Sequence, residues 1–271
     1  MPADETLAQT SAVRSQYLGV HGYGNPIRLG RAFEKRDEVI ARCAEYEEVV
    51  LWFEHDLYDQ LQLLQILHFL GSQSLPLGKV QLIQTDDFLG NLNPEEFMPL
   101  QTKRRPVNAA TFKLAAQVWD AFRAPTPQPL YDLHDHVTSE MRHLHGAIRR
   151  LFEEYPALRT GLSRTQGQIL DTVAEGANRR DDIFRLSQMR EEAVFLGDAP
   201  FFAILDGMAD SDAPLLERTD LGFSLSALGS KVHAEQSDWL ETHAIDRWIG
   251  GVHLEGDAVW RWDSNARRLV R

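Results

Sequence analysis

The stretch Glu47–Gln60, EEVVLWFEHDLYDQ, carries the clearest structural signal in the chain. Its apolar run, Val49–Phe53, is rich in β-branched and aromatic residues and is too short for a buried helix. That pattern predicts a strand covered on both faces, as in a parallel sheet. Leucines then recur at helical spacing, and Asp56 can cap the first turn of the helix that they indicate. Glu54, His55 and Asp56 therefore lie at the carboxyl end of the strand, where open α/β sheets bind their ligands.

The composition narrows the classes of protein to which the chain can belong. An apolar fraction of 43% and a charged fraction of 25% are typical of a folded globular protein, and 271 residues suffice for two domains. A net charge of −12 argues against binding to nucleic acid or to an anionic membrane surface. No apolar run approaches the roughly 20 residues that span a bilayer, and the chain begins without the apolar segment of a signal peptide. We therefore expect a cytoplasmic protein without a membrane partner.

The first half, residues 1–125, has the pattern of a Rossmann-like α/β domain. Helices are expected at about Met1–Gly24 and Pro26–Tyr46, and a second strand at Val80–Ile83. The order helix–strand–helix–strand predicts parallel strands joined by a right-handed crossover. The helix after Pro26 is expected to bury its apolar residues, Ile27, Phe33, Val39 and Ile40. Pro94 begins a short helix, and Asn108 caps another that runs to about Phe122.

The second half is expected to contain three parts. Residues 126–160 are predicted to form a stiff connector and a long polar bridging helix, about Thr138–Glu154. Residues 161–242 contain three short helical patterns, two strand patterns and a capped helix, which together predict a winged-helix-like α+β domain. Residues 243–271 carry two alternating runs around Glu255-Gly256-Asp257. These runs predict a terminal β-hairpin that clasps the two halves and buries its tryptophans.

Several motifs, taken together, resemble one bacterial family. They are VVLWFEHDLYDQLQLL, RRPV with WDAFRAPTP downstream, GLSRTQGQIL, FLGD, and IDRWIGGVHL with the later WRWD. The family is known only as domain of unknown function 1835, and the resemblance covers nearly the whole chain. It implies an α/β front half and a helical, winged-helix-like back half, but no established activity. Members of that family usually carry further strands ahead of the part that corresponds to Met1. The resemblance therefore implies either a short member or a chain whose start was placed too late and whose sheet lacks strands.

An acidic cluster at the strand–helix junction is the first candidate site. Asp56, Asp59 and Gln60 are spaced i, i+3 and i+4, so they share one face near the positive end of the helix. Together with Glu54 and His55, they could hold a divalent cation or perform acid–base chemistry. Glu54 and Asp56 are the candidate metal ligands, and Glu54, His55 and Asp56 the candidate catalytic residues. The alternative is a helix cap, which requires only Asp56.

Two further groups could contribute to the same crevice. Asp86 and Asp87 follow the second predicted strand, although an ordinary acidic turn is the favoured interpretation of this pair. Lys103, Arg104 and Arg105 precede a capped helix, and free backbone N–H groups with guanidinium forks suit a phosphate or carboxylate ligand. The alternative is pairing of these bases with the acidic surface of the protein itself.

The histidines outside the first cluster are weaker candidates. His253 lies beside Gly250-Gly251, which permits close approach of a ligand to the backbone, so it is retained as a ligand-binding candidate. The remaining group lacks a zinc spacing and is predicted to be solvated on a polar helix: His134, His136, His143 and His145.

A winged helix would normally suggest DNA binding, but the charge argues against it. The expected recognition helix, about Ala199–Ala209, has no Lys or Arg, and over Ser163–Leu240 acidic residues outnumber basic ones by seven. Such a surface repels phosphates, so packing or protein contact is the expected use of this half.

The sequence therefore leaves two functions open. The first is a metal-assisted hydrolase or transferase that acts on a phosphorylated or nucleotide-like small molecule, with a divalent metal as cofactor. The second is a non-catalytic regulatory or adaptor protein that binds a protein partner through its winged-helix-like half.

Overall fold

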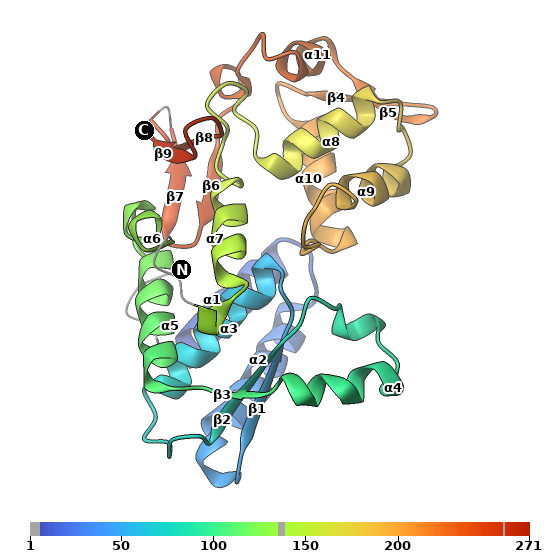
Figure 1. Ribbon diagram of the computed structural model, residues 1–271. Helices are drawn as coiled ribbons and strands as arrows, with labels where there is room; N and C mark the ends of the chain where they lie inside the picture. The colour runs from blue at the N-terminus through green and yellow to red at the C-terminus, as the bar shows by residue number, and fades with distance from the viewer. Residues whose placement is uncertain (1–5, 135–138, 257) are drawn as a thin grey trace. The chain divides into compact units, whose positions relative to one another are not determined.

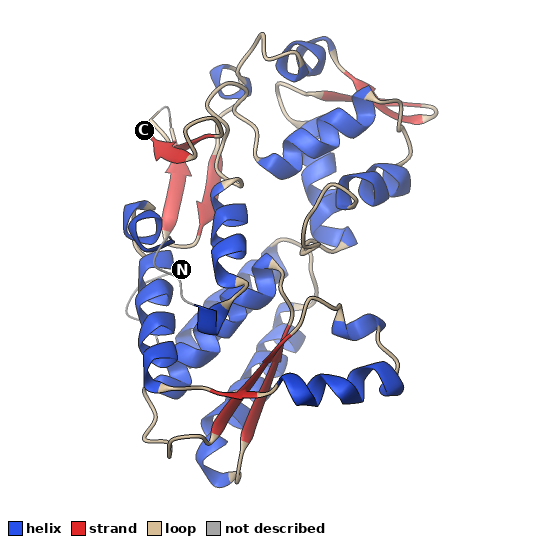
Figure 2. Ribbon diagram, viewed as in Figure 1, coloured by secondary structure: helices blue, strands red, loops and turns tan. Residues whose placement is uncertain are grey.

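The strand predicted at Val49–Phe53 is present with those bounds as β1. The computed structural model describes residues 6–134, 139–256 and 258–271, and the protein is rich in helix, with small sheets (Figures 1 and 2). The chain divides into two units, Met1–Ala147 and Ile148–Arg271. Among the described residues, every helix is too short or too polar to cross a membrane.

The sheet of the first unit has the order β1-β2-β3. β1 pairs in parallel with β2, Val80–Gln84, and the two-residue β3, Arg105–Pro106, pairs antiparallel to β2. The sequence did not predict β3. Because β2 is the central strand, its apolar residues are buried, whereas Val49–Trp52 of β1 remain partly exposed. The prediction that β1 is covered on both faces was therefore wrong for most of its length.

Helices surround this sheet, and their starts follow the predicted capping residues. Asp56 caps α3 and Asn108 caps α5, and these two helices pack against each other. Leu63, Leu64 and Leu67 of α3 are fully buried. The helices of the first unit are α1 Leu7–Val20, α2 Pro26–Ala41, α3 Leu57–Gly71, α4 Pro94–Phe97, α5 Ala109–Phe122 and α6 Gln128–Leu133.

The apolar face of α2 is not buried as predicted. Ile27 and Val39 are more than half exposed, and no residue of α2 is fully buried. The reason is that α2 packs mainly on α1, and residues of both helices line a cavity of about 570 Å³. Ala12 and Phe33 are among the residues that line this cavity.

The predicted bridging helix is shorter and less polar than expected. A 3₁₀ turn at Ser139–Met141 precedes α7, Leu144–Phe152, and Thr138 lies outside the described residues. Leu144, Ile148 and Phe152 are buried, since they recur at helical spacing on one face. The segment is thus an amphipathic helix, and the prediction of a polar helix was wrong because charged residues alternate with this apolar stripe.

The second unit contains the element order that the sequence predicted between residues 161 and 242. Ser163 begins α8 with a capping box, in which its hydroxyl accepts from the Gln166 N–H and the Gln166 side chain accepts from the Ser163 N–H. Ile169, Leu170 and Phe201 belong to the core. The elements are α8 Arg164–Ala174, α9 Arg180–Gln188, α10 Asp198–Asp210, β4 Leu216–Thr219, β5 Gly222–Leu225 and α11 Ala227–His233.

The terminal hairpin is present, but its strands pair differently from the prediction. The two alternating runs do not pair with each other; each forms a hairpin with its own neighbour, β6 with β7 and β8 with β9. The first hairpin turns at Gly250-Gly251, where Gly250 has φ 58°, a conformation that glycine adopts at little cost. Of the three tryptophans in this segment, Trp262 is buried, Trp260 is partly buried and Trp248 is 57% exposed. The prediction that the hairpin buries its tryptophans was therefore wrong for Trp248. The strands are β6 Asp246–Ile249, β7 Val252–Glu255, β8 Arg261–Asp263 and β9 Arg268–Val270.

Candidate functional site

Asp56 lies at the junction of β1 and α3 and is buried. Its Oδ1 accepts hydrogen bonds from the backbone N–H groups of Tyr58 (2.8 Å) and Asp59 (3.1 Å). Burial raises the pKa of Asp56, the nearby charges of Asp59 and Glu54 raise it further, and the two N–H groups offset only part of this. The carboxylate is therefore held in a position where a further positive charge would stabilise it.

The neighbouring side chains are bound to the backbone around the same junction. Asp59 Oδ2 accepts from the Glu54 N–H at 2.6 Å, and Gln60 Nε2 donates to the Glu54 carbonyl at 2.7 Å. Glu54 Oε1 in turn accepts from the Leu89 N–H at 2.8 Å, which ties the loop after β2 to the end of β1. These contacts stabilise the helix start, and each carboxylate uses only one oxygen in them.

Glu54, Asp56 and Asp59 form a cluster of three carboxylates. One oxygen from each lies within 4.8 Å of the others, and within the described part of the chain none of the three forms an ion pair. Gln60 is fully buried beside them, and its Oε1 has no hydrogen-bond partner among the residues that the structure describes. Converging carboxylate and amide oxygens are the ligands that Mg²⁺ and Ca²⁺ prefer. The arrangement thus has the chemistry of a cation site, and Asp59 joins the two ligands predicted from sequence.

The aspartates after β2 have basic partners, in contrast to this cluster. The Asp86 carboxylate lies 3.1 Å from Arg142 Nη2 and 3.6 Å from His143 Nδ1. The Thr85 hydroxyl donates to Asp87 Oδ2 at 2.7 Å, and with Lys103 Nζ at 3.7 Å it lowers the pKa of Asp87. Their charge is already balanced, so they are poor metal ligands compared with the cluster on β1 and α3.

His55 and His143 bring two imidazoles together at this end of the sheet. Their ring centroids are 5.8 Å apart, and His55 also packs on Phe88. His55 Nδ1 is buried and finds no hydrogen-bond partner in the described part of the chain. Burial, with the adjacent charge of Arg142, lowers the pKa of His143 to about 4. The prediction of a solvated His143 was therefore wrong, because the apolar face of α7 draws the start of that segment inward.

His134 and His145, from the same group of histidines, lie against each other. The rings of His134 and His145 stack with centroids 5.9 Å apart, and His136 lies outside the described residues. Neither of the two stacked rings takes part in the carboxylate cluster.

The three predicted bases do not gather at one point. Lys103 lies beside Asp87 at the carboxyl end of β2. Arg104 instead pairs with Glu48, which precedes β1, and Arg105 is exposed, with its Nη1 donating to the Arg104 carbonyl at 3.0 Å. Intramolecular ion pairing, the alternative given for these bases, is therefore found for Lys103 with Asp87 and for Arg104 with Glu48.

His253 belongs to the second unit, on β7. Its Nε2 lies 2.8 Å from Asp246 Oδ1, its Nδ1 lies 3.4 Å from Glu255 Oε2, and its ring stacks on Trp248. It is therefore part of a surface cluster within the hairpin and not of a pocket beside Gly250-Gly251.

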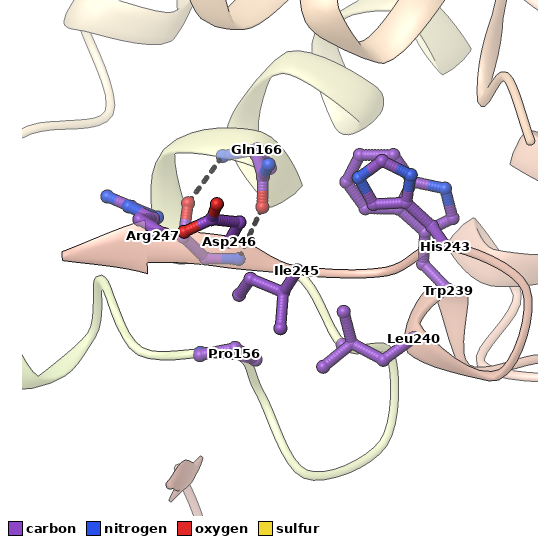
Figure 3. A pocket seen from close by; sticks show the side chains of 10 residues that line it. Pro156, Gln166, Trp239, Leu240, His243, Ile245, Asp246 and Arg247 are labelled. Atoms are coloured by element: carbon purple, nitrogen blue, oxygen red, sulfur yellow. Dashed lines mark hydrogen bonds between the residues drawn. The ribbon is translucent and has the colours of Figure 1, made fainter. Parts of the chain in front are cut away.

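The second unit also contains a cavity of about 200 Å³ (Figure 3). The rings of His243 and Trp239 stack at one end of it, with centroids 4.1 Å apart. Figure 3 shows Gln166 on another wall, with its hydrogen bonds in the α8 capping box dashed. The volume is below that of a typical ligand pocket, and Arg247, which also lines it, is bonded to Glu154. We therefore do not assign a function to this cavity.

Comparison of the chain with protein-family models, with curated proteins and with solved structures gives no match. The resemblance to a family accordingly stays a prediction from sequence motifs.

The site itself contains two residues, Arg142 and His143, that sequence reasoning did not assign to it. The available signal was the apolar spacing of Leu144, Ile148 and Phe152, which places the preceding residues at the start of a buried helix.

Proposed function

We propose that the protein binds a divalent cation at Glu54, Asp56 and Asp59, and that it hydrolyses or transfers a phosphoryl group of a small phosphorylated or nucleotide-like molecule there. The observation that carries the proposal is the cluster of three carboxylates, which have no ion-pair partner among the described residues. The buried Gln60 Oε1, which lacks a hydrogen-bond partner in the same part of the chain, lies beside them. Like charges held close together repel one another, and Asp56 is also buried, so a bound cation would stabilise the cluster.

The architecture that we propose for this site is a Rossmann-like domain followed by a winged-helix-like one, as in the family that the sequence motifs suggest. Support for the first comes from the parallel β1–β2 pair, joined through α3, with polar side chains after both strands. Support for the second comes from the order of helices and paired strands from α8 to β5.

The residues around the cluster have distinct roles in this proposal. A bound cation would supply Lewis-acid stabilisation of phosphate charge. Lys103 and Arg142 lie beside Asp87 and Asp86 and would bind phosphate oxygens through charge-assisted hydrogen bonds. His55, whose Nδ1 has no partner in the described residues, would accept a proton from the attacking group.

The decisive experiment measures cation binding to amide variants. Glu54→Gln and Asp56→Asn keep an acceptor oxygen for the Leu89, Tyr58 and Asp59 N–H groups, so they remove charge while preserving the fold. By isothermal titration calorimetry with Mg²⁺ and Mn²⁺, each should weaken binding by more than the roughly 10- to 100-fold that losing an outer-shell partner costs.

Asp86→Asn is the matched control, because Asp86 is an acidic residue of the same region that is paired with Arg142. It should leave cation affinity within a few-fold of wild type. Equal effects of Asp86→Asn and Asp56→Asn on cation affinity, or wild-type affinity in the Glu54→Gln variant, would contradict the cation site.

The reaction is tested separately, by measuring the release of phosphate from a panel of phosphate monoesters and nucleotides. Lys103→Ala should raise KM without loss of cation affinity.

A second candidate is the regulatory or adaptor function, in which the second unit binds a protein partner. α10 contains no Lys or Arg, and its Asp206 and Asp210 accept from Arg218. Few bases therefore remain in this region for phosphate groups, and a nucleic-acid partner is disfavoured. The exposed Trp248 is the specific observation that favours a protein partner for this unit.

A further inference from the structure

The hairpin of β6 and β7 has one buried face and one exposed face of unusual composition. Alternation along each strand places Ile249, Val252 and Leu254 on the buried face. The opposite face carries Asp246 and Trp248 from β6 with His253 and Glu255 from β7, in the register Asp246↔Glu255 and Trp248↔His253. Both aromatic rings of this face thus come from one cross-strand pair, and both carboxylates come from the next.

The position of Asp246 opposite Glu255 is unfavourable for the stability of the hairpin. Asp246 and Glu255 lie directly opposite each other, and like charges in such positions destabilise a two-stranded sheet. Their side chains are 79% and 69% exposed, and each reaches one nitrogen of the His253 ring between them. The described residues give neither carboxylate an arginine or lysine partner. A local arrangement that works against the fold is typical of a binding surface.

The aromatic pair adds a second element to this surface. The Trp248 indole stacks on the His253 ring with centroids 4.3 Å apart and an interplanar angle of 6°. The side chain is 57% exposed despite this stacking, so the indole presents much of its area to solvent. An exposed indole next to carboxylates attracts a cationic group, because the negative π-face and the carboxylates act on the same charge.

We propose that the exposed face of the β6–β7 hairpin, formed by Asp246, Trp248, His253 and Glu255, binds a lysine- or arginine-rich segment of a partner protein. A cationic side chain would lie against Trp248 and neutralise the Asp246–Glu255 pair. The charge of the face selects this occupant, since its charged side chains are carboxylates, and an acidic segment would be repelled. The proposal is independent of the cation site in the first unit.

The test measures binding of a fluorescein-labelled oligolysine peptide to the full-length protein by fluorescence anisotropy. Trp248→Ala should weaken binding by about threefold to thirtyfold, the range expected for losing a cation–π contact. Trp248→Phe, which keeps an aromatic ring, should recover part of this loss. The double variant Asp246→Asn with Glu255→Gln should also bind oligolysine more weakly than wild type, and its binding should depend less on salt concentration.

Two controls separate a specific surface from general attraction to an acidic protein. Glu217→Gln with Asp220→Asn removes two exposed charges from the β4–β5 hairpin and should leave affinity within twofold of wild type, a margin of roughly 0.4 kcal/mol. An oligoglutamate peptide should not bind. The proposal is overturned if Trp248→Ala binds oligolysine as wild type does, if the two acidic double variants lose affinity equally, or if the Trp248 indole NMR signal responds to a neutral oligosaccharide and not to oligolysine.

Discussion

Arg247 Nη2 donates a hydrogen bond to Glu154 Oε2 at 2.8 Å, although the two residues lie 93 positions apart in the chain. The other carboxylate oxygen accepts from Arg150 Nη1 at 2.8 Å and from the Thr165 hydroxyl at 2.5 Å. Arg150 also forms an ion pair with Glu191 at 2.7 Å. A buried carboxylate thus connects β6 to the end of α7 and the start of α8, with both of its oxygens hydrogen-bonded.

Removal of the Glu154 carboxylate should strongly destabilise the second unit. Glu154→Ala leaves the buried guanidinium of Arg150 with one partner fewer and Arg247 without its carboxylate. Breaking a buried ion pair in this way costs about 3–5 kcal/mol. Chemical denaturation followed by circular dichroism measures the change. Glu192→Ala is the control: Glu192 also pairs with an arginine but is 76% exposed, so its loss should cost less than about 1 kcal/mol.

The same carboxylate should make the protein sensitive to acid in a defined range. Burial raises the pKa of Glu154, but Arg247, Arg150 and the Thr165 hydroxyl outweigh burial and hold it at about 2, below its ordinary value of 4.5. The unfolded chain therefore takes up this proton at higher pH than the folded one. The stabilisation is complete above about pH 5 and is lost as pH falls toward 2.

Unfolding free energies measured across this range test the assignment. Glu154→Gln should be less stable than wild type at neutral pH and should show a smaller decrease between pH 5 and 2. A parallel decrease in the two proteins would show that other carboxylates account for the acid sensitivity.

His143 should produce a separate decrease in stability as pH falls, in an interval above that of Glu154. Its folded-state pKa is about 4, because burial and Arg142 disfavour the imidazolium, whereas the unfolded side chain titrates near 6.5. The unfolded state binds more protons between these values, so stability is greatest above about pH 6.5 and decreases as pH falls to 4. His143→Gln removes the titrating group, and its unfolding free energy should change less over this interval. An NMR titration midpoint for His143 near 6.5 would contradict the burial argument.

The local elements of the fold could be predicted because their signals are local. The Val49–Phe53 run, the caps at Asp56 and Asn108, and the helices after Ser163 depend on periodicity and capping within a few residues. Tertiary pairing was harder. The terminal runs were expected to pair across Glu255-Gly256-Asp257, but the closer Gly250-Gly251 turn joins β6 to β7 first.

The candidate site could be predicted in part for the same reason. Glu54, Asp56 and Asp59 are close in sequence, so helical spacing brings them together. Arg142 and His143 contact Asp86, from which they are separated by 56 or more positions in the sequence. No local sequence pattern predicts a contact between residues so far apart. Arg104 was misleading, because its neighbours in sequence do not show that Glu48 is its partner.

Two helical glycines of the second unit should respond in opposite directions to alanine substitution. A Cβ at Gly229 in α11 would lie 1.9 Å from the Leu215 carbonyl oxygen, which accepts the Ser226 N–H at 3.0 Å. Relief of this clash requires movement of the backbone, so Gly229→Ala should destabilise by roughly 1–3 kcal/mol or more. A Cβ at Gly207 in α10 would meet no heavy atom within 4 Å. Gly207→Ala should therefore stabilise by about 0.5–1 kcal/mol, because alanine loses less entropy than glycine in a helix. Thermal denaturation of both variants distinguishes the cases, and equally small effects of the two substitutions would contradict the close packing of α11 on Leu215.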